Sequence, residues 1–302
     1  MQNKTISITI DVEDWYHIPS VTGSPFSIYK DTHEFFQKWD SRYDYLSRPT
    51  KEILKILDEF NIRATFFVVA DIATHYPGLV ESISDNGHEI ACHGLHHACK
   101  IDPTTKKQIF SAEVFEERTR LAKIQLEKIS GQMVVGYRAP NALFGQWMWN
   151  SLHKLGFTYD SSISINSLYN KADHVPVGVT STPYFPIKNS NNLNNFIEFP
   201  FSYLDLLGLK IPTSGGPMLR FLGDYVILKG LRQSLCRGHT TFYFHPIDIS
   251  TEKFPSVGKG RPLYWVVKGD RVKKRIKNIF NNIKDVEKIC LKDALKGMYH
   301  ED

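Results

Sequence analysis

Residues 5–92 alternate strand-like and helix-like segments, and no other feature of the sequence constrains the fold as strongly. Thr5–Val12 has isoleucine at every second position from Ile6 to Ile10, which is typical of a β-strand. Thr50–Phe60 carries apolar residues at helical spacing, and Ala64–Val69 is the short apolar segment of a strand that is covered on both faces. A helix near 70–86 and a strand over 88–92 follow. This succession predicts an α/β fold with a parallel sheet.

The same alternation continues along the chain. We expect further helices over Pro103–Ile129, Trp147–Leu155, Leu219–Leu235 and Asp270–Ile283, and further strands over Val134–Tyr137, Ile197–Phe199 and Thr240–Phe244. Two stretches lack a clear period: Pro19–Asp44, a long loop with a short helix near Glu34–Trp39, and Asn166–Asn195, which is polar and rich in Asn and Pro.

Polar side chains gather where two of the predicted strands end. Asp11, Glu13 and Asp14 follow the first strand, and His93 and His97 follow the strand over 88–92. In parallel α/β folds ligands and chemistry collect at the carboxyl ends of the strands, so we expect these groups to face one pocket. Three carboxylates in four residues are costly to hold together without a cation, and neutral imidazole is a common ligand of borderline metals. The alternatives are a solvated acidic turn and a histidine-rich loop.

Composition limits the class of protein without identifying it. The 302 residues are 42% hydrophobic and 23% charged, as in a globular enzyme, and the net charge of +5 comes largely from Lys268–Lys292. This mild excess does not predict nucleic-acid binding. We find no signal peptide and no apolar segment long enough to span a bilayer, and the four cysteines are too sparse for a disulfide framework. We therefore expect a cytoplasmic protein without an integral membrane segment.

Three more strand ends carry polar groups, namely Arg138, Asp160 and His245. Together the strand ends give four motifs: Asp11-Val12-Glu13-Asp14-Trp15, His93-Gly94-Leu95-His96-His97, Gly136-Tyr137-Arg138-Ala139-Pro140 and His245-Pro246. These motifs resemble those of polysaccharide deacetylases with a NodB-type domain, carbohydrate esterase family 4, in particular the branch associated with bacterial exopolysaccharide loci. The resemblance covers Thr9 to about His245.

The resemblance implies a distorted (β/α) barrel of about seven parallel strands. It also implies a divalent metal held by one carboxylate together with His93 and His97. Asp11 would be the general base, paired with Arg138, and His245 the general acid. We expect residues 1–302 to form a single domain, with a core over about 5–250 and a C-terminal helical and strand extension over about 251–302.

Two departures from the family pattern affect the metal site. Many family members have adjacent aspartates, whereas Val12 separates Asp11 from the next carboxylate here. Since side chains alternate along a strand, Glu13 lies on the same face as Asp11 and is favoured as the ligand, with Asp14 as the alternative. Gly94 stands where many members carry Ser or Thr. His96 is expected behind the ligands or at the pocket rim.

The activity implied is metal-dependent hydrolysis of N-acetyl groups on amino sugars in a polysaccharide or glycan precursor. Zn²⁺ is the expected metal, with Co²⁺, Ni²⁺ and Mn²⁺ as alternatives, and the partner is a carbohydrate rather than nucleic acid. We expect Trp15, Pro140, Asn141 and Asp160 to contact substrate, with core packing as the alternative for Trp15. Rival hypotheses are a deacylase of another linear amide or an O-acetyl ester, and a non-catalytic sugar-binding module.

Overall fold

A curled, eight-stranded parallel sheet organises the computed structural model, which describes residues 4–39, 43–186, 196–255 and 266–298. The strands pair in the order β9-β1-β2-β3-β4-β5-β6, and β10 pairs with the start of β1 beside β2. They are β1 (Thr5–Val12), β2 (Thr65–Val68), β3 (Glu89–Cys92), β4 (Gly136–Tyr137), β5 (Tyr159–Asp160), β6 (Ile197–Glu198), β9 (Thr240–Phe244) and β10 (Glu287–Lys288).

The sheet bends until its two edges approach each other. Phe201, just after β6, forms a parallel bridge to Thr241 of β9, and the Ser202 N–H donates to the Thr241 carbonyl at 3.1 Å. Apart from the two-residue β10, seven parallel strands make up this wall, which confirms the predicted α/β class and distorted barrel. The carboxyl ends of these strands therefore meet around one opening.

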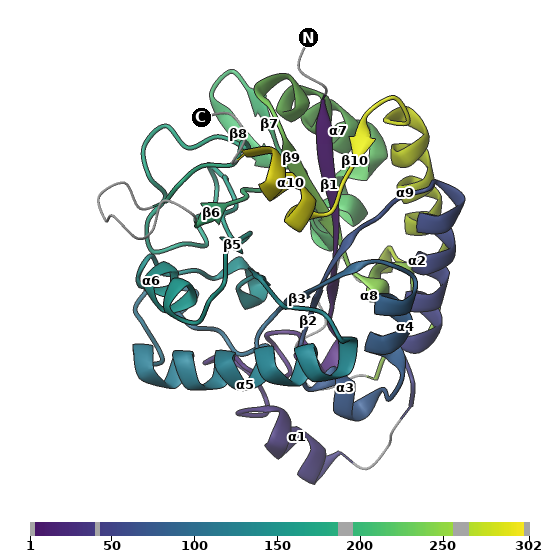
Figure 1. Cartoon of the computed structure of the whole chain (residues 1–302). Helices are drawn as coiled ribbons and strands as arrows, with labels where there is room; N and C mark the ends of the chain where they lie inside the picture. The colour runs from purple at the N-terminus through teal and green to yellow at the C-terminus, as the bar shows by residue number, and fades with distance from the viewer. Residues whose placement is uncertain (1–3, 40–42, 187–195, 256–265, 299–302) are drawn as a thin grey trace.

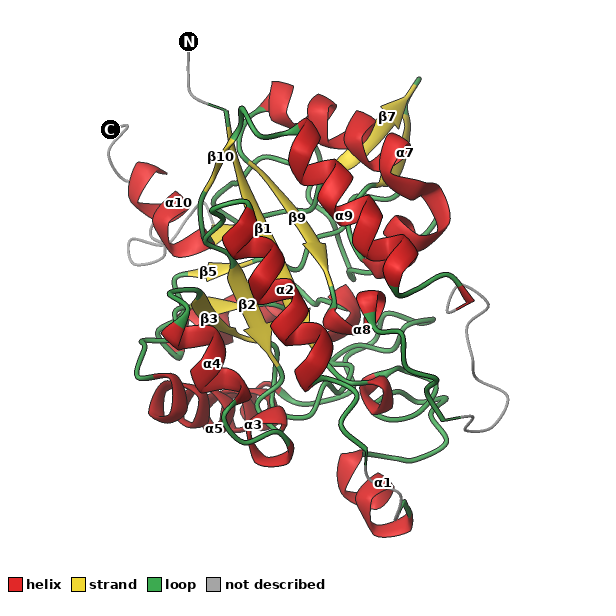
Figure 2. Ribbon diagram, turned by 90° about the vertical axis from the view of Figure 1, so that its right-hand side faces the viewer, coloured by secondary structure: helices red, strands yellow, loops and turns green. Residues whose placement is uncertain are grey.

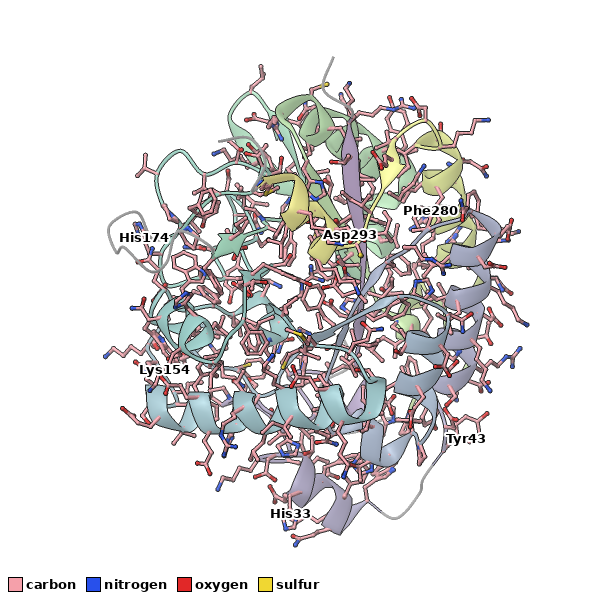
Figure 3. All side chains as sticks on the ribbon, in the orientation of Figure 1. His33, Tyr43, Lys154, His174, Phe280 and Asp293 are labelled. Atoms are coloured by element: carbon pink, nitrogen blue, oxygen red, sulfur yellow. The ribbon has the colours of Figure 1, made fainter. Side chains whose placement is uncertain are left out.

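Helices surround the outside of the barrel (Figures 1 and 2). They are α1 (Thr32–Lys38), α2 (Ser47–Glu59), α3 (Ile72–His75), α4 (Leu79–Asp85), α5 (Ala112–Ser130), α6 (Trp147–Lys154), α7 (Gly216–Arg237), α8 (Pro246–Ile249) and α9 (Asp270–Asn282). Side chains fill the space between these helices and the sheet, while charged groups such as Lys154 extend outward (Figure 3). The basic helix α9 buries Val272, Ile276 and Ile279, as its apolar spacing predicts.

The C-terminal helix α10 (Leu291–Met298) closes the amino-terminal end of the barrel. Its first backbone N–H groups donate to side chains that begin two strands: Leu291 to Thr65 Oγ1 at 2.9 Å and Lys292 to Glu89 Oε2 at 3.1 Å. Leu291 and Leu295 pack with interior side chains of the strands, including Phe67 of β2. Only the opposite end of the barrel is therefore available for a site built from strand ends.

Two helices differ from the sequence prediction, each for a local reason. The helix expected over 70–86 is broken into α3 and α4, because Pro77 lacks an N–H and Gly78 adopts a left-handed φ of 82°. The helix expected from Pro103 begins only at Ala112, where Ser111 caps it. Asp102 instead accepts N–H bonds from the two residues that follow Pro103, which stabilises a turn.

The later part of the chain contains elements that the sequence did not predict. Strands β7 (Tyr203–Leu206) and β8 (Leu209–Pro212) form an antiparallel hairpin whose turn residues, Leu207 and Gly208, both have positive φ. Helix α7 is kinked at Gly223, which has a φ of 76°. The expected loop over 166–195 is described only up to residue 186.

No helix among the described residues combines the length and apolar character needed to cross a bilayer. All four cysteines are free thiols.

Candidate active site

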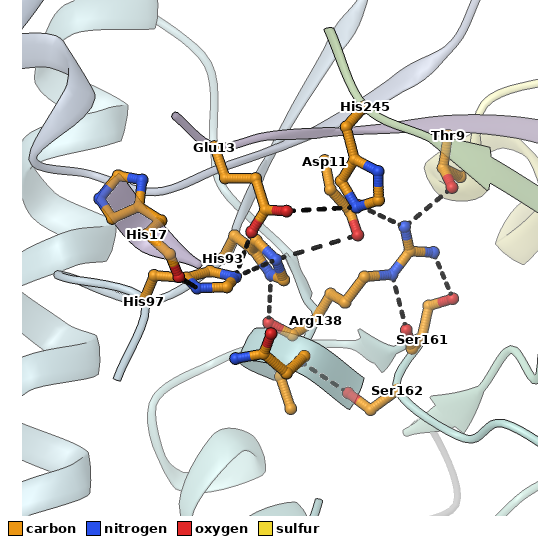
Figure 4. Close-up of polar contacts among 12 residues, drawn as sticks. Thr9, Asp11, Glu13, His17, His93, His97, Arg138, Ser161, Ser162 and His245 are labelled. Carbon is orange, nitrogen blue, oxygen red and sulfur yellow. Dashed lines mark hydrogen bonds and ion pairs between the residues drawn. The ribbon is translucent and has the colours of Figure 1, made fainter. Parts of the chain in front are cut away.

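A cavity of about 270 Å³ opens at the carboxyl ends of the strands. Six of the residues predicted at strand ends line it: Asp11, Glu13, His93, His97, Arg138 and His245. They come from β1, β3, β4 and β9 and from the loop that follows β3. The close-up in Figure 4 shows them converging from opposite sides of the barrel. The fold therefore brings together groups that are as far as 234 residues apart, from Asp11 to His245.

Glu13, His93 and His97 form a cluster of possible metal ligands, since one ligand atom from each lies within 4.8 Å of the others. The two imidazole Nε2 atoms are 3.2 Å apart, and His97 Nε2 is 2.5 Å from Glu13 Oε2. Each Nδ1 faces a backbone carbonyl, that of Arg138 at 2.8 Å for His93 and that of His17 at 2.9 Å for His97. A carbonyl oxygen can only accept, so both Nδ1 atoms carry the proton and both Nε2 atoms are free to bind.

This donor set fits a divalent cation. Burial lowers the pKa of His93 to about 4, because desolvation disfavours the imidazolium, and a neutral imidazole is the form that binds metal. Burial opposes ionisation of Glu13, but the imidazoles of His97 and His245 hold its pKa below the usual range. Two nitrogen lone pairs and one carboxylate thus face one point, the arrangement of three-ligand sites that keep a position open for water or substrate.

Asp11 and Arg138 form a buried ion pair beside the cluster. Arg138 Nη1 lies 2.6 Å from Asp11 Oδ1, while Asp11 Oδ2 is 3.9 Å from His93 Nε2. The guanidinium also donates to Thr9 Oγ1 at 2.9 Å and, through two nitrogens, to the carbonyl and hydroxyl of Ser161 at 2.8 Å each. With its remaining donors held and its face stacked over the ring of Phe67 at 4.0 Å, Arg138 fixes the position of the Asp11 carboxylate.

His245 directly follows β9, faces the cluster and lies between two carboxylates. Its Nε2 is 3.3 Å from Glu13 Oε1, and its Nδ1 is 2.9 Å from Asp248 Oδ2. Asp248, the third residue of the short helix α8, also pairs with Arg220 of α7. Burial alone would lower the pKa of His245, but the carboxylates of Asp248 and Glu13 raise it to about 9. Its position and its raised pKa make His245 a candidate proton donor.

The backbone after Arg138 makes a tight turn at the pocket wall. Asn141 and Ala142 have φ values of 59° and 56°, which non-glycine residues rarely adopt. Asn141 lines the cavity, and its carbonyl accepts a hydrogen bond from Lys171 Nζ at 3.0 Å. Residues in such conformations persist only where their surroundings enforce them, so this turn is a candidate for binding a reacting group.

Asp14 and Trp15 are not part of this cavity. Asp14 accepts from the Trp15 N–H at 2.7 Å and from the hydroxyl of Tyr76, so its side chain points away from His93 and His97. It caps the 3₁₀-helix η1 (Trp15–His17), whose turn rotates the chain after Glu13. Trp15 is buried among aromatic rings of the α1 region instead of facing the site, in agreement with the core-packing alternative.

Pro140 and Asp160 do not line the cavity either. Pro140 is buried against Gly94, where an added Cβ would lie 3.5 Å from the Pro140 ring. Asp160 is completely buried, accepts from the Ser162 hydroxyl at 2.6 Å and pairs in register with Glu198 of β6. Of the four residues expected to contact substrate, only Asn141 borders the pocket.

Several residues of the site had no separate prediction. Asp248 follows His245 by three residues, the spacing of a helix-capping pair, which is the one local signal that could have indicated it. Arg220 and Lys171 lie in a helix and a loop without a recognisable motif. His96, which is half-exposed, sits behind the cluster with its Nδ1 3.3 Å from Asp71 Oδ2, as expected for a residue that is not a third ligand.

Comparison with known proteins gives a consistent result. Residues 33–159 match the family model "Polysaccharide deacetylase", and residues 164–287 match "Domain of unknown function (DUF3473)". The peptidoglycan-N-acetylmuramic acid deacetylase PdaA of Bacillus subtilis (strain 168) is 25% identical over 160 residues, 48% of this chain and 58% of its own. The peptidoglycan deacetylase of Helicobacter pylori (strain 26695) is 30% identical over 115 residues, 38% of this chain and 36% of its own. The chain thus spans less than two thirds of either relative.

Solved structures share the fold. A Mycobacterium smegmatis protein assigned as a polysaccharide deacetylase superposes with a TM-score of 0.63 at 21% identity, covering 99% of this chain and 91% of its own. The Puue allantoinase superposes with a TM-score of 0.59 at 15% identity, covering 98% and 90%. At these identities the likeness concerns the barrel alone.

Proposed function

We propose that this chain, whose residues 33–159 match the polysaccharide deacetylase family model, is a metal-dependent hydrolase that removes N-acetyl groups from amino sugars in a polysaccharide or a glycan precursor. One observation carries the proposal. A buried Asp–Arg pair, a His₂–Glu cluster and a histidine with a raised pKa border a single cavity. Hydrolysis of an amide needs a base for water and an acid for the leaving amine, and these residues supply both.

Glu13, His93 and His97 are the residues that would hold the metal, and Zn²⁺ suits their nitrogen and oxygen donors. When bound, such an ion supplies Lewis acidity, which polarises a carbonyl and acidifies water. Co²⁺, Ni²⁺ and Mn²⁺ bind similar donor sets, so reconstitution with each ion and comparison of the rates identifies the working metal.

The chain's own residues would then perform the proton transfers. Asp11, held by Arg138, accepts a proton from the water that attacks the acetyl carbonyl carbon. The Asn141 N–H, which has no backbone acceptor among the described residues, donates to the oxygen that becomes negative. His245 gives its proton to the sugar nitrogen as the carbon–nitrogen bond breaks, which leaves acetate and a free amine.

Acetate release from N-acetylated oligosaccharides, measured with the zinc-loaded protein, tests this function. Asp11→Asn should lower the rate by about 10²- to 10⁴-fold, the usual contribution of a general base. Asp58→Asn, on the exposed face of α2, is the matched control and should keep the wild-type rate. Release from simple linear amides or O-acetyl esters in place of the sugars would favour the rival deacylase hypothesis. Absence of any release by the wild type would contradict the proposal.

A further inference from the structure

Two arginines and one lysine border the cavity, and they differ in how their charge is compensated. Arg138 pairs with Asp11, and Arg220 pairs with Asp248. Lys171 bonds to a neutral group instead, the Asn141 carbonyl, with its Nζ 3.0 Å away. No carboxylate of the described residues lies within 4.0 Å of the Lys171 ammonium. The pocket thus contains one cation that the protein itself does not neutralise.

The position of Lys171 is enforced from both sides. Ser167, just before it, exchanges hydrogen bonds with Lys210 of β8, and the Asp173 N–H, just after it, donates to the Phe144 carbonyl at 3.0 Å. Tyr169 donates to the Pro103 carbonyl at 2.7 Å, and both residues line the cavity. Hydrogen bonds at Ser167, Tyr169 and Asp173 therefore fix the segment 166–173 where it borders the cavity. The Lys171 side chain is thus already ordered before a ligand binds.

Leaving this ammonium without an anion has a cost. Burial lowers the pKa of Lys171, because desolvation disfavours its charged form, and Glu13 raises it only in part. Glu13 is itself engaged by His97, and a cation bound at the cluster would neutralise it further. With such an ion in place the cationic groups around the cavity outnumber the carboxylates. An anionic group on the ligand would offset this imbalance.

We infer that the substrate carries a carboxylate or a phosphate close to the acetylated amine, and that Lys171 binds this anionic group. The inference rests on the proposed deacetylase activity and narrows its substrate class to acidic amino-sugar compounds. Lys171 stands next to the Asn141 turn, so an anion bound there lies adjacent to an acetyl group that the turn contacts. The pairing selects substrates by charge and takes no part in the proton transfers.

Calorimetric binding to the zinc-loaded His245→Asn protein tests the inference, because this variant keeps the Asp11–Arg138 pair and should turn substrate over only slowly. The carboxylate arm compares a tetrasaccharide of alternating N-acetylglucosamine and N-acetylmuramic acid with neutral chitotetraose. The phosphate arm compares N-acetylglucosamine 1-phosphate with N-acetylglucosamine. In at least one arm the acidic probe should bind about tenfold more tightly, a typical value for one partly buried charge pair. The arm that responds identifies the anion.

Lys171→Met should abolish this preference and leave binding of the neutral probe within about twofold. Lys106→Met is the matched control: Lys106 also bonds to a backbone carbonyl and to Tyr169, but it does not line the cavity. It should keep the preference. In the wild-type background, Lys171→Met should raise KM for the acidic substrate and leave kcat unchanged.

Equal binding of acidic and neutral probes in both arms, or a preference that survives in Lys171→Met, would overturn the inference. A uniform fall in kcat on neutral and acidic substrates would also overturn it, because Lys171 would then act on the turn or the oxyanion. These outcomes are separate from failure of the proposed function, which is absence of acetate release by the wild type with every substrate.

Discussion

The cavity is built from two regions of the chain that contribute in different ways. Residues up to β5 supply Asp11, Glu13, His93, His97 and Arg138, each at or just beyond the end of a parallel strand. Residues after 164, which match a family model of unknown function, supply one strand-end histidine and three partners that come from helices and a loop. In the proposed mechanism, the first region provides the groups that would hold a cation and activate water. The second would provide the proton donor and the residues that hold it, and it contributes the lysine that has no carboxylate partner.

The two regions share one sheet, so neither can form the pocket alone. β6 pairs with β5, and β9 pairs with β1, which places the second region on both sides of the first. We propose that the matched segments form a single domain and that the segment of unknown function completes the deacetylase site.

The largest effect belongs to the metal cluster of the first region. His97→Ala should abolish metal retention and lower acetate release by about 10³-fold or more, since Lewis-acid catalysis supplies several kcal/mol. Metal analysis of the dialysed protein, alongside the rate, provides the measurement. His96→Asn is the control, because His96 is the neighbouring imidazole outside the cluster. Wild-type metal content in His97→Ala would refute the assigned cluster.

A smaller effect is expected for the proton donor of the second region. His245→Ala should lower acetate release by about 10²- to 10³-fold, the usual share of a general acid, while one equivalent of metal stays bound. Metal content and rate together separate the two regions. The first-region variant His97→Ala should lose both metal and activity, whereas the second-region variant His245→Ala should lose activity alone. Loss of metal from His245→Ala would mean that His245 is a ligand and that the division is wrong.

Arg220→Met tests the support behind His245. Asp248 has two cationic partners, and removal of Arg220 leaves only His245; breaking a buried ion pair in this way typically costs about 3–5 kcal/mol of unfolding free energy. The double variant Arg220→Met/Asp248→Asn should recover part of this loss, because no unpaired carboxylate remains. Urea denaturation of both variants measures the difference. If the double variant is less stable than Arg220→Met, the two residues do not act as a pair.

The smallest effect concerns the seam between the regions, where Asp160 of β5 and Glu198 of β6 are buried side by side. Burial raises the pKa of Asp160 to about 6 and that of Glu198 well above its usual range, so the folded protein holds a proton that the unfolded chain releases above about pH 4. The stability this pair contributes is therefore fully present in acid and declines as the pH rises through 6.

Glu198→Gln should flatten that decline. The glutamine oxygen can still accept from the N–H groups of Ser162 and Ile163, but it carries no proton to lose. Thermal unfolding between pH 4 and 9 provides the comparison, with the exposed Glu81→Gln as the control. An identical pH slope in wild type and Glu198→Gln would contradict a shared proton at the seam.

The groups at strand ends were predictable because the topology of parallel sheets gathers them. Strand alternation also separates Asp11 and Glu13 from Asp14, since every second side chain faces the barrel interior. The same rule explains why Asp160 is not in the pocket. It pairs in register with Tyr137, whereas the next residue of each strand, Ser161 and Arg138, faces inward.

The positions of the other residues around the site depend on tertiary packing, which no local sequence pattern predicts. Arg220 reaches Asp248 only because α7 lies against the strand-to-helix turn at His245, and Lys171 reaches Asn141 only because a polar loop is anchored at the rim. Trp15 follows the core-packing alternative for a related reason: a 3₁₀ turn places it in an aromatic cluster with Phe35 and Trp39.

A crystal structure of the zinc-loaded protein soaked with acetate would show whether residues of both regions contact the same acetyl group. We expect an anomalous zinc peak among Glu13, His93 and His97, with acetate in contact with both the Asn141 N–H and His245. Zinc bound elsewhere, or acetate that contacts residues of the first region while His245 remains distant, would contradict it.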